Sequence, residues 1–363
     1  KFFSNYFLKQ ALFFIIFTAL YISYFLARNQ TAIKMEKLLH VSLEKKKYGA
    51  TLSHILKKLL RGRTSKLKIA NALWLDSKYT LLQDFLKFIE SNYGDSIHQL
   101  NFEDSQETSN KINAWVSEIT EGKINNILTP ASIKEDMGLI IANAIYFMGK
   151  WDKTFKVRNT KNQSFNLITG ESVQVPMMHQ TDKFGFLEEE EFQVLEMPYK
   201  SHPSYMEDMS MIIFLPREIK GLIEFEKTLT IEKIRDSIDR LKVKRVEIFI
   251  PRLKMETFID LERTISLMGL SNLFADDADF SGIADPSKYL PLKVSELLHK
   301  AYIEVNEEGT EAAAATMMTF IGTGLLKPPP IFRADHPFLF IIQDTQIKVI
   351  LFYVNYDKSE SYI

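Results

Sequence analysis

The chain has 363 residues, 46% of them hydrophobic and 12% aromatic, which is enough apolar material for a large buried core. Its 45 basic and 46 acidic residues give a formal net charge of -1, so no overall field draws it to nucleic acid or to an anionic membrane. It has no cysteine, which excludes disulfides, thiolate nucleophiles and cysteine-ligated metals. Without repeats, low-complexity tracts or Gly/Ser-rich linkers, residues 1–363 are expected to form one domain.

An uncharged apolar run from Ala11 to Ala27 makes the N-terminal region, residues 1–30, atypical. The run has 17 residues, the lower limit for a membrane span, and its end lacks the small-x-small cleavage site of a signal peptide. A helix buried on all sides gives the same pattern and is the leading interpretation. A signal or anchor segment and a mis-assembled terminus are the alternatives.

Two sequons mark candidate glycosylation sites, Asn29 in Asn-Gln-Thr and Asn162 in Asn-Gln-Ser. Such asparagines receive glycans only in the secretory pathway, so they predict a secreted, extracellular glycoprotein. A cytoplasmic location is the alternative, because a chain without cysteine carries no redox signature of its compartment.

Helical periodicity predicts a helix over residues 105–124, behind the start signal Asp104-x-x-Glu107. Its apolar face would carry Ile112, Val116 and Ile119. A second helix is expected over residues 261–270.

Strand patterns lie on both sides of these helices. Strands are predicted over residues 67–75, 139–148, 210–215 and 246–250. Residues 338–342 and 347–353 then predict a buried antiparallel hairpin around a polar tetrapeptide. Because helices and strands mix without a βαβ rhythm, the sequence indicates a mixed α/β chain of the α+β class with mostly antiparallel sheets.

No catalytic or metal-binding constellation is present: the chain lacks the zinc-protease, nucleophile-elbow, phosphate-loop and dinucleotide motifs, and its seven histidines are scattered. The sequence therefore predicts neither an enzyme nor a metal site. One local cluster of cations could bind a sulfated polysaccharide through counterion release, although a soluble helix face is the simpler interpretation. It consists of Lys57, Lys58, Arg61, Arg63, Lys66 and Lys68.

The segment from Ala301 to Pro330 has contradictory local preferences. A strand-like start, Ala301 to Val305, is followed by acidic residues and by the alanine run Ala312 to Ala315, which favours helix. The continuation contains glycine and β-branched residues, and Pro328 to Pro330 forbid both helix and central strand. Such a segment can take more than one conformation.

The run from Leu298 to Thr316, LHKAYIEVNEEGTEAAAAT, resembles the hinge signature of the serpins, the serine protease inhibitor family, nearly residue for residue. Five further segments are similar to serpin landmarks in the family's order: Asn143 to Trp151, Val175 to His179, Met209 to Pro216, Ala278 to Gly282, and Ala334 to Phe340. The resemblance covers roughly Thr31 to the end. Before Thr31 the chain is truncated or divergent, and the family's initial helix is not recognisable.

The resemblance implies the serpin fold: three mostly antiparallel sheets surrounded by about eight to nine helices, with a hinge and exposed reactive-centre loop at residues 306–330. It implies a monomeric inhibitor rather than an enzyme, one that a serine protease cleaves and that then traps the acyl-enzyme by inserting its loop into the central sheet. No cofactor is implied, and neither a membrane nor a nucleic acid is an expected partner. A non-inhibitory binding or storage protein and a membrane-tethered structural protein are the alternatives.

The hinge that would insert carries small side chains that alternate with their neighbours, which favours an inhibitory member. Its residues are Glu307, Glu308, Gly309, Thr310, Glu311, Ala312, Ala313, Ala314, Ala315 and Thr316. Counting as in the family places the reactive bond between Thr323 and Gly324, with cleavage after Leu325 or Leu326 as alternatives. An elastase-like or chymotrypsin-like target is expected rather than a trypsin-like one. By the same resemblance, Asn143, Trp151 and His299 belong to the region where the sheet opens.

Overall fold

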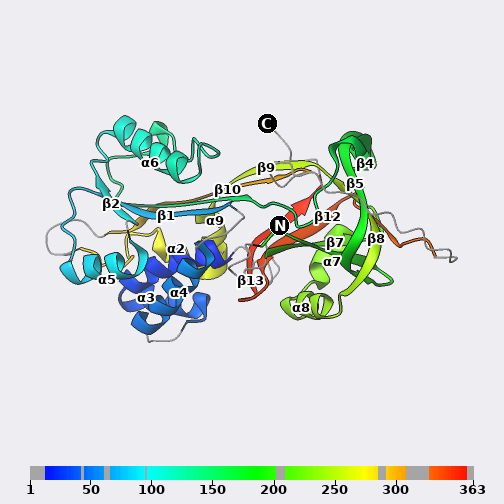
Figure 1. Cartoon of the computed structure of the whole chain (residues 1–363). Helices are drawn as coiled ribbons and strands as arrows, with labels where there is room; N and C mark the ends of the chain where they lie inside the picture. The colour runs from blue at the N-terminus through cyan, green and yellow to red at the C-terminus, as the bar shows by residue number, and fades with distance from the viewer. Residues whose placement is uncertain are drawn as a thin grey trace.

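Two hydrogen-bonded β-sheets form the framework of the protein in the computed structural model (Figure 1). The structure describes residues 13–41, 45–60, 66–94, 96–201, 209–284, 292–307 and 327–357. The five-stranded sheet has the order β2-β1-β3-β10-β9. Its strands are β1 (Lys66–Asp76), β2 (Ile97–Leu100), β3 (Leu139–Met148), β9 (Leu253–Asp260) and β10 (Val294–Val305).

The eight-stranded sheet has the order β11-β8-β5-β6-β7-β12-β13, with β4 paired to β5. Its strands are β4 (Lys161–Asn166), β5 (Ser172–Glu188), β6 (Phe192–Pro198), β7 (Met209–Pro216), β8 (Lys242–Pro251), β11 (Ile331–Arg333), β12 (Phe338–Asp344) and β13 (Val349–Tyr356). Strand β5 pairs with β8 over residues 177–186 and with β6 over residues 185–188. This long strand joins two of the three expected sheets into one hydrogen-bonded network, and the α+β serpin-like class is confirmed.

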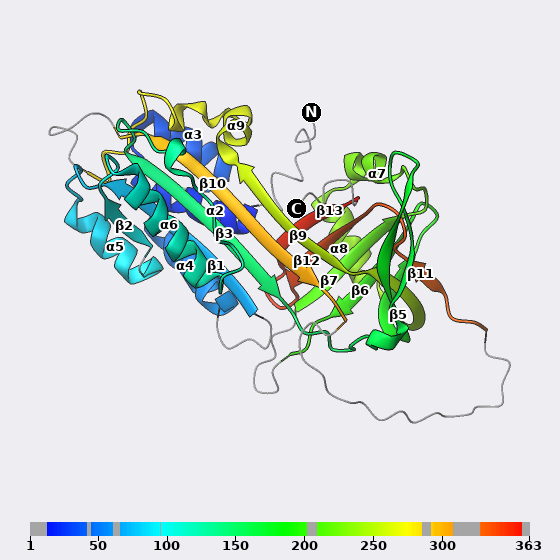
Figure 2. The ribbon, with the colours of Figure 1, turned by 90° about the horizontal axis from the view of Figure 1, so that it is seen from above.

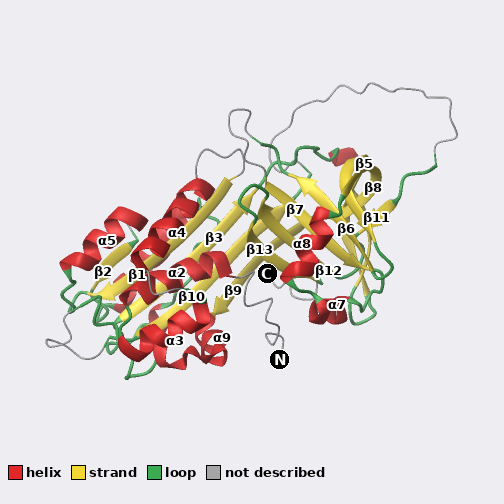
Figure 3. Cartoon of the chain, turned by 90° about the horizontal axis from the view of Figure 1, so that it is seen from below, coloured by secondary structure: helices red, strands yellow, loops and turns green. Residues whose placement is uncertain are grey.

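The described residues form eight α-helices around these sheets. In Figures 1 and 3, α2, α3, α4, α5 and α9 lie on one face of the five-stranded sheet and α6 lies on the other, while α7 and α8 lie beside the eight-stranded sheet. Their bounds are α2 (Phe13–Leu26), α3 (Asn29–Leu39), α4 (Lys45–Leu60), α5 (Gln83–Tyr93), α6 (Ser105–Ile119), α7 (Leu222–Thr228), α8 (Ile231–Asp239) and α9 (Leu261–Ile265).

Strand alternation separates the two faces of the five-stranded sheet. On β1, Ala72 and Trp74 pack towards α6, whereas Leu73 and Leu75 join the core that contains α2. Polar contacts tie the segment after α6 to the sheet on the same side. Lys66 and Lys68 of β1 reach Glu121 at 2.7 and 3.3 Å, and Lys300 of β10 donates from Nζ to the Asn126 carbonyl oxygen at 2.8 Å.

The apolar N-terminal run forms helix α2, which is buried as predicted. Leu20, Tyr21 and Ile22 have no exposed surface, and the buried Ser23 hydroxyl donates to the Ala19 carbonyl at 3.0 Å. The buried-helix interpretation of this run is therefore confirmed. Among the helices of the described ranges, none has the length and hydropathy required to cross a bilayer.

The predicted elements are confirmed with different ends. Helix α6 starts as expected, with the Asp104 side chain accepting from the Glu107 amide at 2.8 Å. It ends at Ile119 rather than at residue 124, because Glu121 and Gly122 adopt φ of 54° and 74°, which no helix continues through. The second predicted helix is regular only to Ile265 and then becomes a wider turn.

Candidate functional site

The boundary between β3 and β10, which we call the seam, is the central feature of the five-stranded sheet. The two strands run parallel, in register from Leu139 opposite Val294 to Phe147 opposite Ile303. Their other neighbours, β1 and β9, are both antiparallel to them. Figure 2 shows β3 and β10 side by side, and the predicted hinge follows the end of β10 at Val305 along the chain. The seam is therefore the parallel pair from which that loop departs.

A row of three polar side chains crosses the seam near its middle. Asn71 of β1 lies opposite Asn143 of β3, which lies opposite His299 of β10. Asn143 donates from Nδ2 to the Asn71 Oδ1, and its own Oδ1 contacts the His299 Nδ1. Since that oxygen can only accept, Nδ1 of His299 carries a proton. The two predicted residues, Asn143 and His299, are thus brought together.

Burial controls the charge of this row. Asn143 is fully buried and His299 is 7% exposed. Desolvation lowers the pKa of His299 to about 4, so the ring is neutral at physiological pH. A neutral, fully bonded row costs little to bury, whereas a strand entering the seam would have to break the bond between Asn143 and His299.

Asn71 was not predicted as a site residue. A usable signal was present, because Asn71 is the polar residue in the otherwise apolar stretch Ile69 to Leu75, and a buried polar group needs a partner. Its partner depends on the strand register, which the sequence pattern does not supply.

The end of β10 is anchored where the loop begins. The indole Nε1 of Trp151 donates to the Asn306 carbonyl at 2.9 Å, and the Trp151 ring stacks on Tyr199 with centroids 4.4 Å apart. The Phe155 amide donates to the Glu307 carbonyl, also at 2.9 Å. The predicted role of Trp151 near the start of the loop therefore has a direct geometric basis.

Glu307, the first predicted hinge residue, is held by its side chain as well. It is only 3% exposed, and Nε of Arg252 lies 2.7 Å from both carboxylate oxygens, with Thr160 donating to one of them. Burial raises the pKa of Glu307, but the hydrogen bonds from Arg252 and Thr160 outweigh it and hold this pKa below its usual range. The hinge thus starts from a fixed, ionised carboxylate.

The remaining loop residues lie outside the described residues. They are Glu308, Gly309, Thr310, Glu311, Ala312, Ala313, Ala314, Ala315 and Thr316 of the hinge, and Thr323, Gly324, Leu325 and Leu326 at the reactive bond. The described chain continues from Lys327, and residues 327–330 lead into β11, which pairs with β8.

The predicted polysaccharide cluster is divided between two faces of the sheet. Lys57 and Lys58 lie on α4, whereas Lys66 and Lys68 reach Glu121 on the side of α6 (Figure 1). Arg61 and Arg63 lie outside the described residues. The four described lysines therefore do not form one row, and polysaccharide binding stays a prediction.

The two sequon asparagines are both exposed, at different places. Asn162 lies on β4. Asn29 begins α3 and donates from Nδ2 to Asp279 at 2.6 Å, so a glycan there would attach to a nitrogen already engaged in the fold. Asn162 is the more accessible of the two.

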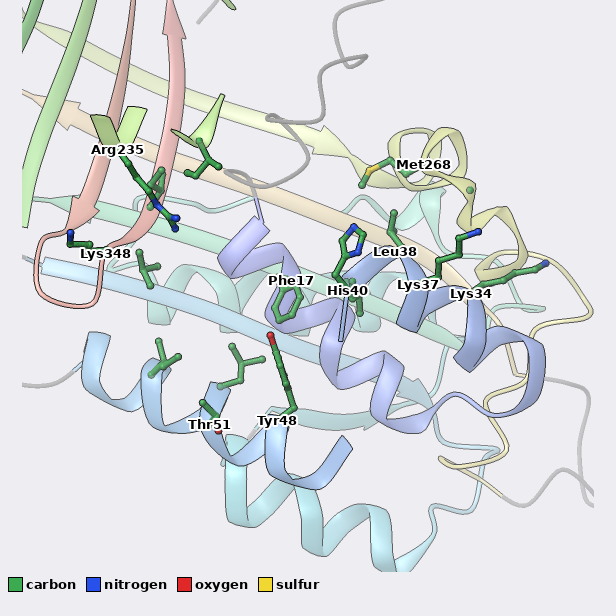
Figure 4. Close-up of a pocket in the computed structure, with 17 residues that line it drawn as sticks. Phe17, Lys34, Lys37, Leu38, His40, Tyr48, Thr51, Arg235, Met268 and Lys348 are labelled. Carbon is green, nitrogen blue, oxygen red and sulfur yellow. The ribbon is translucent and has the colours of Figure 1, made fainter. Parts of the chain in front are cut away.

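A hollow of about 870 Å³ lies away from the seam, between α2, α3, α4, α8 and β13 (Figure 4). Phe17 and Tyr48 lie in its middle, and cationic side chains lie towards its ends, Lys34 and Lys37 at one and Arg235 and Lys348 at the other. An apolar centre flanked by cations suits a ligand with an apolar body and negative ends.

Comparisons with known proteins agree with this geometry. The family described as "Serpin (serine protease inhibitor)" matches residues 14–356, beginning well before Thr31. Serpin B4 of Homo sapiens is 38% identical, covering 90% of this chain and 87% of its own length. Leukocyte elastase inhibitor of Sus scrofa is 36% identical, covering 90% and 86%. The native stressed conformation of Arabidopsis AtSerpin1 superposes with a TM-score of 0.83 at 28% identity, covering 94% of this chain and 89% of that one. The chain belongs to the serpin family.

Proposed function

We propose that this chain inhibits a serine protease as a suicide substrate. The protease cleaves the loop near Thr323–Gly324, and the acyl-enzyme is trapped while residues 308–323 enter the five-stranded sheet at the seam. The observation that carries the proposal is the topology of the seam: β10 leads directly into the loop, and its neighbour β3 runs parallel to β10.

Parallel strands make this entry favourable. A segment that reverses direction after β10 runs antiparallel to β10 and also to β3, so insertion replaces one parallel pair by two antiparallel pairs. For about a dozen residues at a net ~1 kcal/mol per ladder hydrogen bond, the gain is on the order of 10 kcal/mol. This energy is large enough to distort the oxyanion hole of a bound protease and stall deacylation.

The hinge sequence suits entry into a packed sheet. Thr310, Ala312, Ala314 and Thr316 alternate onto one face of an inserted strand, and all four are small. Glu311 falls on the opposite face, so its charge need not enter the core. From Thr310 to Thr316, no proline or large charged residue lies on the face that enters.

The target proposed is an elastase-like or chymotrypsin-like protease. The loop offers threonine, glycine and leucine around the reactive bond, and a relative that is 36% identical is named leukocyte elastase inhibitor. Lys327 precedes Pro328, which makes cleavage by a trypsin-like enzyme there unfavourable. We expect the inhibitor to act as a monomer.

Replacing Thr310 by arginine tests the mechanism. The protein is incubated with pancreatic elastase and with chymotrypsin, and covalent complexes are counted by denaturing electrophoresis. The native chain should form a complex, and Thr310→Arg should be converted to cleaved substrate, because an arginine on the inward face blocks entry. Ala313→Arg is the matched control, since it places the same charge on the opposite face. Full trapping by Thr310→Arg would refute insertion.

The second candidate is a non-inhibitory binding or storage protein, and the hollow beside α8 favours it. Its apolar centre and terminal cations would accept an amphiphilic anion. The heat resistance of the cleaved chain separates the two functions. An inhibitor gains heat resistance when cleaved because its loop inserts, whereas equal unfolding midpoints for intact and cleaved chain would favour the binding protein.

A secreted location with a glycan on Asn162 is proposed from the sequon and its exposure. Expression in animal cells followed by glycosidase treatment gives the test. A loss of mass in Asn162-containing peptides of the secreted protein supports it, and an unmodified chain retained in the cytoplasm supports the alternative location.

A further inference from the structure

Strands β5, β8 and β11 form a small ribbon, and one side of this ribbon carries several solvent-exposed side chains. Lys183 lies directly opposite Arg245, and Gly185 lies opposite Val243. Because directly opposite residues project to the same side, these residues share one face. The same register rule adds Ile331 and Arg333, which lie opposite Glu247 and Phe249. We call this side the outer face; the opposite side carries the core residues Phe184, Phe186, Val246, Ile248 and Phe332.

Positive charge dominates the outer face. Its cations are Lys183, Arg245 and Arg333, and the adjoining hollow beside His179 adds Arg158 and Lys161. Among the described residues none of these five cations forms an ion pair. Of the carboxylates on this face, Glu247 is hydrogen-bonded to His179 at 3.0 Å, and Glu196 of β6 lies opposite Gly185 and is partly buried.

Two of the four acidic residues near the end of β5 are already paired with other cations. Glu188 pairs with Arg217 at 2.8 Å, and Glu189 pairs with Arg240, whereas Glu190 and Glu191 follow as exposed residues. Within the outer face itself, the cations outnumber the carboxylates and give a net positive field towards solvent.

Exposed apolar side chains lie among these cations. Val243 is 75% exposed and Ile331 is 51% exposed. An ordinary solvated strand places polar residues at such positions, whereas arginine mixed with exposed aliphatic side chains is typical of protein interfaces.

Chain length places the reactive bond close to the outer face. Five Cα–Cα steps separate Leu326 from Ile331, which is at most about 17 Å, and eight steps put Thr323 at most about 26 Å away. A protease domain of about 240 residues has a radius of gyration of about 18 Å. A protease held on the loop can therefore reach the outer face.

We propose that the outer face is a second contact surface for the protease bound on the loop, and that it selects enzymes with an acidic surface beside the active site. This inference rests on the proposed inhibitory function and adds to it a basis for choosing among proteases with similar pockets. The contact acts mainly on the association rate, because complementary charge steers the encounter before the loop is engaged.

The test uses one protease in three surface-charge states. Chymotrypsin, or pancreatic elastase if only that enzyme is trapped, is used unmodified, with lysines acetylated, and with lysines succinylated. The association rate with the native chain should rise in that order, by about 10-fold overall at low salt, and the rise should vanish at high salt. In the double variant Lys183→Glu/Arg245→Glu the order should disappear or reverse, with an unchanged number of inhibitor molecules used per protease trapped.

The matched control is Lys87→Glu/Lys134→Glu, the same charge change on exposed residues of α5 and of the segment before β3, and it should keep the native order. Equal rates for all three protease forms with the native chain, or an order kept by the double variant, would overturn the inference while leaving inhibition intact. If no form of either protease is trapped by the native chain, the inhibitory function itself fails. If the double variant loses only its retention on heparin-agarose and keeps the native rates, the surface binds polyanions and the inference is wrong.

Discussion

The seam of the five-stranded sheet and the β7–β12–β13 block of the eight-stranded sheet are built in opposite ways. Residues 338–342 of β12 are all apolar and have no exposed surface, and β12 pairs antiparallel with both of its neighbours. The seam is a parallel pair with a polar row at its centre, Asn143 bonded to His299. Closely packed apolar side chains cannot be separated one contact at a time without loss of packing. Hydrogen bonds between two strands, in contrast, can be replaced one by one by bonds to an incoming strand. Under the proposed insertion, the eight-stranded block persists and the seam opens.

The largest effect is expected in the persistent block. Phe340→Ala removes a fully buried ring, which should destabilise the fold by about 4 kcal/mol. For a chain of this length that lowers the thermal unfolding midpoint by about 5 °C. Because the block does not take part in insertion, calorimetry should find the same decrease in the intact and the cleaved protein. A decrease confined to one form would mean that the block also rearranges.

A somewhat smaller effect should appear at the anchor of the loop. Arg252→Ala leaves the buried carboxylate of Glu307 with only Thr160 as a side-chain partner, a loss of about 3 kcal/mol in the intact state. The intact form should lose heat resistance and the cleaved form should change little, as measured by their two midpoints. Adding Glu307→Gln to Arg252→Ala should recover most of the loss, because the uncompensated charge is then gone. If the double variant stays as unstable as Arg252→Ala, the pair contributes by packing rather than by charge.

The smallest effect is a pH dependence of the seam. The pKa of His299 is about 4 in the folded protein and about 6.5 when unfolded, so between these values the unfolded state binds the extra proton. Stability is therefore complete above pH 6.5 and declines as the pH falls towards 4, by about 2 kcal/mol at pH 5. His299→Gln keeps a donor for Asn143 and should remove this decline.

The comparison must be made as native chain minus variant at each pH, because Glu296 acts in the opposite direction. Burial and its acidic neighbours raise the pKa of Glu296 to about 7, so its contribution to stability is lost as the pH rises. Identical slopes for the native chain and His299→Gln between pH 6.5 and 4 would mean that His299 takes up its proton in the folded state as readily as in the unfolded state.

Local sequence patterns predicted the helices and strands well. Residues that meet across long stretches of chain were predicted only through the resemblance to a family. Strand β3 was predicted with its observed bounds because every residue in it is apolar or small except Asn143. Glu307 was predicted as a hinge residue, but Arg252 precedes it by 55 residues and nothing in the local pattern points to it. The same holds for Asn71, whose role depends on register. Lys66 and Lys68 belong to an apparent cationic cluster along the chain, yet in the fold both form ion pairs with Glu121.

The contacts that follow helix α6 limit how fast the sheet can widen. Glu121 is bound to β1 through Lys66, and Asn126 is bound to β10 through Lys300, so this short stretch crosses the seam. A sixth strand between β3 and β10 would move β1 and β10 apart by about 4.8 Å. Under the proposed insertion, one of these two contacts has to break before the loop can pass, so α6 and the segment after it would act as a strap across the seam.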